Sequence, residues 1–413
     1  MSLHMREQEE TETVFDRFEP IDLPVNKSDQ VVSCEYAGRS PRLVKTTIRK
    51  VNWRTLGRSF ELPILVLPDV LLGKTAAPFT NYYARHLAWK RQALPWISDE
   101  KIQRLARDDL KVMQLGFPAL DDEASALGLA ACLTIVCYVD SIIEEMEPEL
   151  AEQCIEWCLA ILEGADLDEQ IGEQYLSTDQ VQSTFLTNIF LAKNPGSPLE
   201  QAATICFAFY RHIIDIFRPI TAEAVLFDMR DMIAGQLPEL HFKQGKLKIN
   251  SYHDYLSIRN RSFGLLPLLT IAEHYHLAKD GLAATSPDIA LLKTQISIMC
   301  IGQNDVGGLE KDIELSNTSN SILVLAMLAG RKIETSDGVL ESEDLLRLFE
   351  VKNRIFVNDV IETWGRVQIS SKVEAEHRLS DMLIVLCITH LEWVLTSSRY
   401  DIESVLEGDC VGS

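Results

Sequence analysis

Apolar residues recur at three- and four-residue spacing along most of the chain from about residue 79 onward. The segments 81–94, 98–115 and 121–164 show this spacing clearly. It is the spacing that brings apolar side chains onto one face of an α-helix. Strict alternation of apolar and polar residues, which would indicate β-strands, is nearly absent after residue 60. The pattern therefore predicts an all-α domain of about ten to twelve helices around one core.

Start and stop signals support these helices. Ser98 and Asp99 open one helix and Asp121–Asp122 another, because these residues favour the positive N-terminal end of a helix. Clusters of glycine and proline at 192–198 and 278–287 predict loops. Further helices are expected near 199–217, 221–235, 252–276, 287–313, 318–330, 341–366 and 371–397.

The first part of the chain has a different pattern. It is charged and broken by prolines, and a basic stretch rich in β-branched residues follows. We expect a partly ordered N-terminal arm over residues 1–60, with a short strand. The helical domain is expected over 61–405, and a C-terminal tail over 406–413.

Composition and charge narrow the class of protein. With 413 residues, 46% of them hydrophobic, the chain can bury a large core. Its net charge of −22 argues against a nucleic-acid partner, which needs clustered lysine and arginine. The nine cysteines form no CxxC pair, which favours a reducing compartment. We expect a cytoplasmic protein with no membrane span, since no long uncharged apolar run is present.

The stretch "IGQNDVGGLEKDIEL" at 301–315 places polar residues between two apolar runs. On a continuous helix Asn304, Gly308 and Asp312 would share one face. An amide oxygen and a carboxylate two turns apart suit a hard cation. The alternative is a helix that ends at Gly307–Gly308 and is followed by a solvated loop. This stretch alone leaves both interpretations open.

A second acidic stripe follows the apolar run that leads into Asp140. Asp140 and Glu144 lie four residues apart, on one helix face, with Glu145 beside them. A lone buried carboxylate would be costly, although the helix could simply become exposed here. Two oxygen-rich stripes indicate a shared divalent site for magnesium rather than zinc. Asp121–Asp122 is a competing candidate, but it opens its helix and is expected to cap it.

Basic residues occur on two other apolar segments. "YLSIRNRSFG" carries Arg259 and Arg261, and Arg399 with Tyr400 follows the last apolar helix. Arginine binds phosphate oxygens with two parallel hydrogen bonds. Together with the acidic stripes, these residues predict a pocket for a metal-bridged phosphate ester whose other walls are hydrophobic.

Two of these segments resemble the metal-binding motifs of class I terpene synthases, in particular the single-domain terpene cyclases of fungi and bacteria. The family's DDxx(D/E) motif looks like "DSIIE" at 140–144, with Ser141 in place of the second aspartate. The family's (N/D)Dxx(S/T)xx(K/R)(E/D) motif is similar to "NDVGGLEKD" at 304–312, with Gly308 where a hydroxyl residue is usual.

Two further motifs extend the resemblance over about residues 60 to 405. The family's diphosphate-sensing arginine looks like Arg259, which stands 45 residues before Asn304. The family's terminal tryptophan and Arg–Tyr pair resemble Trp393 and Arg399–Tyr400. The resemblance implies the family's helical fold around a central apolar cavity.

The resemblance also implies roles for individual residues. It assigns three Mg²⁺ ions, of which Asp140 with Glu144 or Glu145 would hold two. Asn304 and Asp312 would hold the third, with water in place of the hydroxyl missing at Gly308. The residues that would bind the diphosphate are Arg259, Lys311, Arg399 and Tyr400. Phe263 would trigger ionisation where its helix breaks, and Trp393 would stabilise the carbocation.

The implied activity is that of a carbon–oxygen lyase. It would ionise farnesyl diphosphate and close it to a cyclic sesquiterpene, with a humulyl-type 1,11-closure as the expected mode. The alternatives are a diterpene cyclase, a prenyl diphosphate synthase of the same fold, and a non-catalytic helical binding protein. A prenyl diphosphate synthase needs two full DDxxD motifs, and the chain has none. We expect a monomer or a homodimer.

Overall fold

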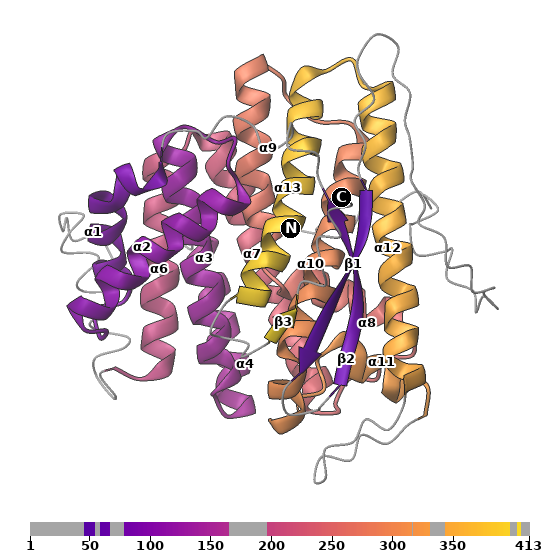
Figure 1. Cartoon of the computed structure of the whole chain (residues 1–413). Helices are drawn as coiled ribbons and strands as arrows, with labels where there is room; N and C mark the ends of the chain where they lie inside the picture. Colours follow the sequence, from indigo (N-terminus) through magenta and orange to yellow (C-terminus); the bar gives the residue numbers. More distant parts are fainter. Residues whose placement is uncertain are drawn as a thin grey trace, which may run out of the picture.

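The computed structural model describes residues 45–53, 58–66, 78–164, 196–315, 317–330, 343–396 and 403–405. Its helices lie side by side in a bundle (Figure 1). A short 3₁₀ helix, η2 (Phe79–Tyr82), precedes them. The α-helices are α1 (Tyr83–Ala93), α2 (Asp99–Gly116), α3 (Glu123–Glu144), α4 (Pro148–Leu162), α6 (Pro198–Ile216), α7 (Pro219–Lys243), α8 (Tyr252–Ser262), α9 (Leu266–Asp280), α10 (Pro287–Glu314), α11 (Ser321–Leu328), α12 (Glu343–Ser370) and α13 (Glu374–Thr396).

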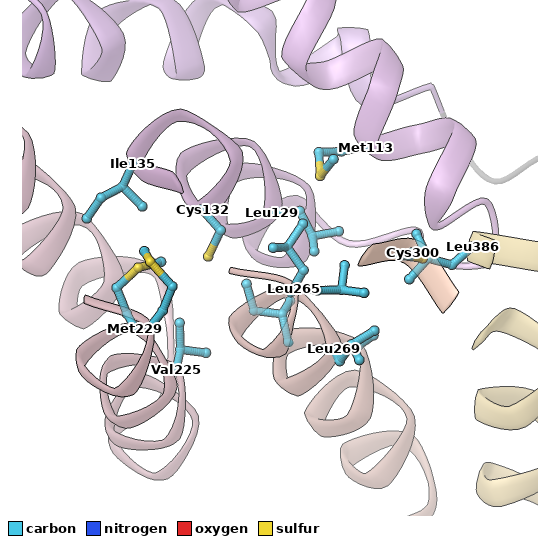
Figure 2. Close-up of a cluster of buried hydrophobic side chains, with 14 of the residues drawn as sticks. Met113, Leu129, Cys132, Ile135, Val225, Met229, Leu265, Leu269, Cys300 and Leu386 are labelled. Atoms are coloured by element: carbon cyan, nitrogen blue, oxygen red, sulfur yellow. The ribbon is translucent and has the colours of Figure 1, made fainter. Parts of the chain in front are cut away.

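One core connects most of these helices. Met113 on α2, Cys132 on α3, Met229 on α7, Leu269 on α9 and Leu386 on α13 point toward this core from different sides (Figure 2). Among the described helices, α3 is long and apolar enough to cross a membrane, but 61% of its most apolar stretch is buried inside the protein. That burial is what a central core helix shows, because neighbouring helices cover its apolar faces.

A small antiparallel sheet lies against the helices. Its strands are β1 (Lys45–Trp53), β2 (Arg58–Val66) and β3 (Glu403–Val405), in the order β2-β1-β3. The sheet contacts α12 and α13, and it joins the early part of the chain to its C-terminal part (Figure 1). The domain boundary expected at residue 60 falls inside β2.

Two predicted helix bounds are wrong. The helix expected to end at 235 is α7, which continues through Pro238 to Lys243. The single helix expected from the spacing over 252–276 is broken between α8 and α9, where the resemblance implied a break at Phe263. A capping box at Ser251 and Asp254 fixes the start of α8, since each residue bonds the other's backbone N–H.

The break between α8 and α9 depends on Gly264. Its φ is +79°, a left-handed conformation that favours glycine. A Cβ atom at this position would lie 2.7 Å from both methyl carbons of Val136 on α3. The glycine therefore allows both the turn and the close approach of two cavity-lining segments.

Replacing Gly264 by alanine is expected to reduce the free energy of unfolding by about 2–3 kcal/mol, because backbone strain and a steric clash add together. Gly245→Ala is the matched control. Gly245 has a φ of +70°, but a Cβ atom there meets nothing within 4 Å. The control should lose only about 1 kcal/mol. Denaturant titration of both variants measures the difference, and equal losses would contradict the contact with Val136.

Candidate active site

A cavity of about 200 Å³ opens among α2, α3, α7, α8, α10 and α13. Most of its wall is apolar. The apolar side chains that line it include Val112, Met113, Phe117, Leu133, Val136, Leu265, Leu268 and Leu386. Acidic, basic and amide side chains from α3, α7, α8 and α10 line the remainder. The cavity therefore combines a hydrophobic wall with a strongly charged region.

The structure brings most of the predicted site residues to this cavity. Those that line it are Asp140, Glu144, Arg259, Phe263, Asn304, Gly308, Lys311, Asp312 and Trp393. Glu145 is exposed at the end of α3 and does not line the cavity. Arg399 and Tyr400 lie outside the described residues.

The α10 side of the cavity is one continuous helix. Because α10 runs unbroken to Glu314, the interpretation of Gly307–Gly308 as a helix end is wrong. A Cβ atom at Gly308 would lie 3.2 Å from Asp312 Oδ2, so the glycine leaves room for that carboxylate. The side-chain amides of Asn317 and Asn320 donate to Asp312 at 3.0 and 2.8 Å. Burial raises the pKa of Asp312 to about 6.

The α3 side of the cavity carries Asp140 and Glu144. No described residue hydrogen-bonds the Asp140 carboxylate, although several charged groups surround it. Burial, and next the negative charge of Glu144, raises the pKa of Asp140 to about 6. Glu144 itself accepts a hydrogen bond from Lys243 Nζ at 2.8 Å. Asp140 is therefore a carboxylate held in an unfavourable environment, which a cation would relieve.

The competing pair at 121–122 has a structural role. Asp122 caps α3 by accepting a hydrogen bond from Ser125 N at 2.8 Å. Asp121 accepts hydrogen bonds from Tyr275 and Lys279, which hold its pKa below the usual range. Neither aspartate lines the cavity. The capping role expected from the sequence is present in the structure.

The acidic residues of α3 and those of α10 each provide part of a ligand set for a divalent cation. Carboxylate and amide oxygens on α3 and α10 are the donors that Mg²⁺ prefers. Within the described residues, no three acidic, histidine or cysteine side chains are close enough to hold a metal ion by themselves. A cation would need further oxygens, which water and a diphosphate group can supply.

Arg259 on α8 has hydrogen-bonding capacity left over. Its Nη1 lies 3.2 Å from each oxygen of the Glu239 carboxylate, and its Nη2 lies 3.8 Å from Asp305 Oδ1. Its Nε is buried and has no hydrogen-bond partner. The Phe263 ring centroid is 5.7 Å from the guanidinium carbon. Because the Arg259 side chain lines the cavity, its guanidinium can also bind phosphate oxygens of a ligand there.

Two residues of this charged region, Glu239 and Lys243, were not predicted from the sequence. Glu239 is 2% exposed and accepts hydrogen bonds from Ser262 and Ser319. Lys243 Nζ lies 3.1 Å from Glu239 Oε1. Burial alone would raise the pKa of Glu239, but the charges of Arg259 and Lys243 outweigh it and lower that pKa. In the sequence, Glu239 and Lys243 stand four residues apart, a spacing that places both side chains on one face of a helix.

Asp305 is adjacent to the predicted ligand Asn304 but has other partners. It is 1% exposed and accepts hydrogen bonds from Tyr255 and from the backbone and side chain of Ser321. These bonds tie α10 to α8 and to the start of α11. Asp305 therefore holds together the helices that carry Arg259 and Asn304.

Comparison with known families adds a sequence match. Residues 131–336, about half of the chain, match the family model described as terpene synthase family 2, C-terminal metal binding. The matched range includes Asp140, Arg259 and the polar face of α10. No curated protein sequence matches the chain.

Comparison with solved structures confirms the all-α fold. Aristolochene synthase from Penicillium roqueforti is 15% identical, with a TM-score of 0.52 over 78% of this chain and 95% of that one. A variant of cucumene synthase is 15% identical, with a TM-score of 0.52 over 79% and 97%. An ancestral reconstruction, the SVS_A2 protein, is 13% identical, with a TM-score of 0.54 over 80% and 89%. At these identities the similarity establishes the fold.

Proposed function

This chain belongs to terpene synthase family 2, a class I terpene synthase family, and from that premise we propose that it converts farnesyl diphosphate to a cyclic sesquiterpene and diphosphate. The reaction type, a metal-dependent cyclisation of a prenyl diphosphate, follows from the family. The substrate length and the product are the proposal.

One observation carries this proposal. Charged and apolar residues line the same cavity, and both Asp140 and Asp312 lie close enough to Arg259 for their charges to interact. A prenyl diphosphate has the same division, an anionic head on a hydrocarbon tail. The acidic pair would hold cations, and the basic pair would bind the anion directly.

The residues on α3 and α10 would hold the divalent cations, and we propose three Mg²⁺ ions. Asp140 and Glu144 supply oxygens on one side, and Asn304 and Asp312 supply them on the other. When bound, Mg²⁺ neutralises negative charge on the diphosphate and so favours its departure. Arg259 and Lys311 donate hydrogen bonds to diphosphate oxygens. Their positive charges stabilise the charge that develops as the C–O bond breaks.

The cavity wall then controls the carbocation. Phe263 and Trp393 present aromatic rings, and each can stabilise a nearby cation by about 1–2 kcal/mol when water is excluded. Leu133, Leu265 and Leu386 are apolar neighbours that cannot add a nucleophile. The fold of the bound chain, and hence the ring that closes, depends on this wall.

Incubation with the C10, C15 and C20 prenyl diphosphates, with and without EDTA, tests the proposal. We expect a cyclic C15 hydrocarbon from farnesyl diphosphate with magnesium, and no product when EDTA is present. Gas chromatography with mass spectrometry also tests the humulyl-type 1,11-closure. A cyclic C20 product would identify a diterpene cyclase instead, and a longer linear diphosphate would identify a chain-elongating enzyme.

We also propose a cytoplasmic protein that acts as a monomer or homodimer. The free, buried cysteines among the described residues, such as Cys132, Cys158 and Cys300, support a reducing compartment. Fractionation tests the location, and sedimentation at several protein concentrations tests the assembly state.

Diphosphate with magnesium is expected to raise the melting temperature of the protein, because a ligand that binds only the folded state stabilises it. At one hundred times the dissociation constant the gain is about 2.7 kcal/mol. Differential scanning fluorimetry with magnesium alone, diphosphate alone and both together measures it. Only the combination should give the full shift. No shift at saturating concentrations would contradict a site that binds both.

A further inference from the structure

One polar side chain in the cavity wall has no role in ionisation. His390 on α13 lines the cavity beside two aromatic residues. Its ring centroid lies 6.0 Å from that of Phe263, edge to face, and 5.8 Å from that of Trp393. It is therefore next to the rings expected to stabilise the carbocation.

The hydrogen bonds around His390 determine which ring nitrogen carries the proton. Gln303 Nε2 on α10 donates to Cys387 O at 3.1 Å, which fixes the orientation of the Gln303 amide. Gln303 Oε1 then lies 2.8 Å from His390 Nδ1. A carbonyl oxygen only accepts hydrogen bonds, so Nδ1 carries the proton. The second nitrogen, Nε2, has a free lone pair.

The lone pair of His390 Nε2 accepts no hydrogen bond from the described part of the chain. Nε2 has no hydrogen-bond partner there, and it is not among the enclosed polar atoms that lack one. Because the side chain lines the cavity and its Nδ1 is bonded to Gln303, we infer that Nε2 is directed toward the cavity. Burial lowers the pKa of His390 to about 4, so the imidazole is neutral at pH 7. A neutral base therefore lines the cavity in which the carbocation would form.

On the basis of the proposed function, we propose that His390 is the base that takes the terminating proton from the carbocation. Nε2 uses its lone pair to bond a hydrogen on the carbon next to the cationic centre. The electron pair of that C–H bond becomes the new C=C bond and cancels the positive charge. The resulting imidazolium keeps Nδ1–H on Gln303 and later returns the proton from Nε2 to the released diphosphate or to water.

The acid–base chemistry agrees with this assignment. An alkyl carbocation is a far stronger acid than an imidazolium, so even a weakly basic imidazole accepts its proton. The low pKa of His390 then makes proton return easy and restores the neutral ring for the next turnover. Because the base has a fixed position, it also selects which neighbouring carbon loses its proton.

The test compares products and diphosphate release in the full-length enzyme. His390→Phe keeps a flat ring beside Phe263 and Trp393 but removes the lone pair. We expect diphosphate release to continue, while the share of the wild-type alkene falls at least about tenfold in favour of other alkenes or alcohols. Gln303→Leu removes the group that positions the imidazole and should shift the products in the same direction.

The protonation state of each His390 ring nitrogen can be measured directly, and another buried histidine provides a control. The ¹⁵N spectrum of the imidazoles should show a protonated Nδ1 and an unprotonated Nε2 for His390, and Gln303→Leu should change that signature. His276→Gln is the control, because His276 is also buried with its pKa lowered to about 4 but does not line the cavity. Its product spectrum should match that of wild type.

Two results would overturn the inference in distinguishable ways. An unchanged product spectrum in both His390→Phe and Gln303→Leu, with diphosphate still released, would exclude His390 as the base and leave the proposed function intact. No release of diphosphate by the wild type from any prenyl diphosphate would overturn the proposed function and this inference together.

Discussion

Replacing Asp140 by asparagine is expected to slow turnover at least about a hundredfold, since it removes a charged ligand from the cation site. Asp140 lines the cavity and receives no hydrogen bond from a described residue. Steady-state kinetics at several magnesium concentrations measures the loss. Asp121→Asn is the control, because Asp121 is bonded to Tyr275 and Lys279 outside the cavity. Loss of activity in the control alone would show that the cation site had been assigned to the wrong aspartates.

The same substitution should stabilise the metal-free protein at pH 7. The folded-state pKa of Asp140 is about 6, above its ordinary value of 3.8. Between these two pH values the folded state retains a proton that the unfolded state has lost. Stability from this group therefore falls as pH rises from about 4 to about 6. Asparagine avoids that loss, a gain on the order of 1 kcal/mol after allowance for solvent screening.

Denaturant titration from pH 4 to pH 7 with EDTA tests this second expectation. The variant should gain on the wild type as pH rises, and its circular dichroism should stay helical. A variant that is less stable at pH 7 would mean that Asp140 supports the fold, and its loss of activity would then be uninformative about cations.

Replacing Arg259 by lysine is expected to lower kcat/KM about a hundredfold, because lysine cannot supply two parallel hydrogen bonds with fixed geometry. In the structure Arg259 contacts both oxygens of Glu239 and retains a buried Nε without a partner. Lysine would keep the charge but lose this arrangement. The loss should also reduce the melting-temperature shift caused by diphosphate with magnesium.

Arg261→Lys is a closely matched control. Arg261 lies on the same helix and makes a comparable pair, with Nε and Nη2 at 3.0 and 2.7 Å from Asp231 Oδ1. It does not line the cavity, and its side chain is 43% exposed. Its activity should stay within about twofold of wild type, since exposed ion pairs contribute little. Equal losses in both variants would indicate damage to α8 rather than to diphosphate binding.

Sequence alone predicted the helical fold and much of the cavity, because its signals were local. The spacing of Asn304, Gly308 and Asp312 requires only a continuous helix, and α10 provides it. Asp140 and Glu144 need only the last turns of α3. The two oxygen-rich stripes suggested a shared divalent site, and the resemblance to the family's motifs supported that interpretation.

Glu239 and Lys243, which were not predicted, lie in the part of α7 beyond the helix expected from the sequence. The helix expected over 221–235 stops short of Pro238, a residue type that usually interrupts a helix. In the structure α7 continues past Pro238, and this last part carries Glu239 and Lys243. Their pairing with Arg259 and Glu144 is long-range, and one sequence does not display it.

The opposite error occurred at the break between α8 and α9. Apolar spacing suggested one helix over 252–276, although Gly264 and Pro267 were signals of a break. The requirement for glycine comes from Val136, more than one hundred residues earlier, whose methyl groups leave no room for a Cβ atom. The role of His390 is equally non-local, since it depends on Gln303.

Lys243 also affects how the enzyme binds cations and diphosphate. Its ammonium group bridges Glu144 at 2.8 Å and Glu239 at 3.1 Å. A cation bound at Glu144 would compete with Lys243 for that carboxylate and weaken the bond between them, which leaves the ammonium more able to bind an anion. Occupancy by cation and by diphosphate therefore favour each other, and thermodynamic linkage makes this cooperativity reciprocal. Raising the magnesium concentration should lower the substrate concentration needed for half-maximal rate, and raising substrate should do the same for magnesium.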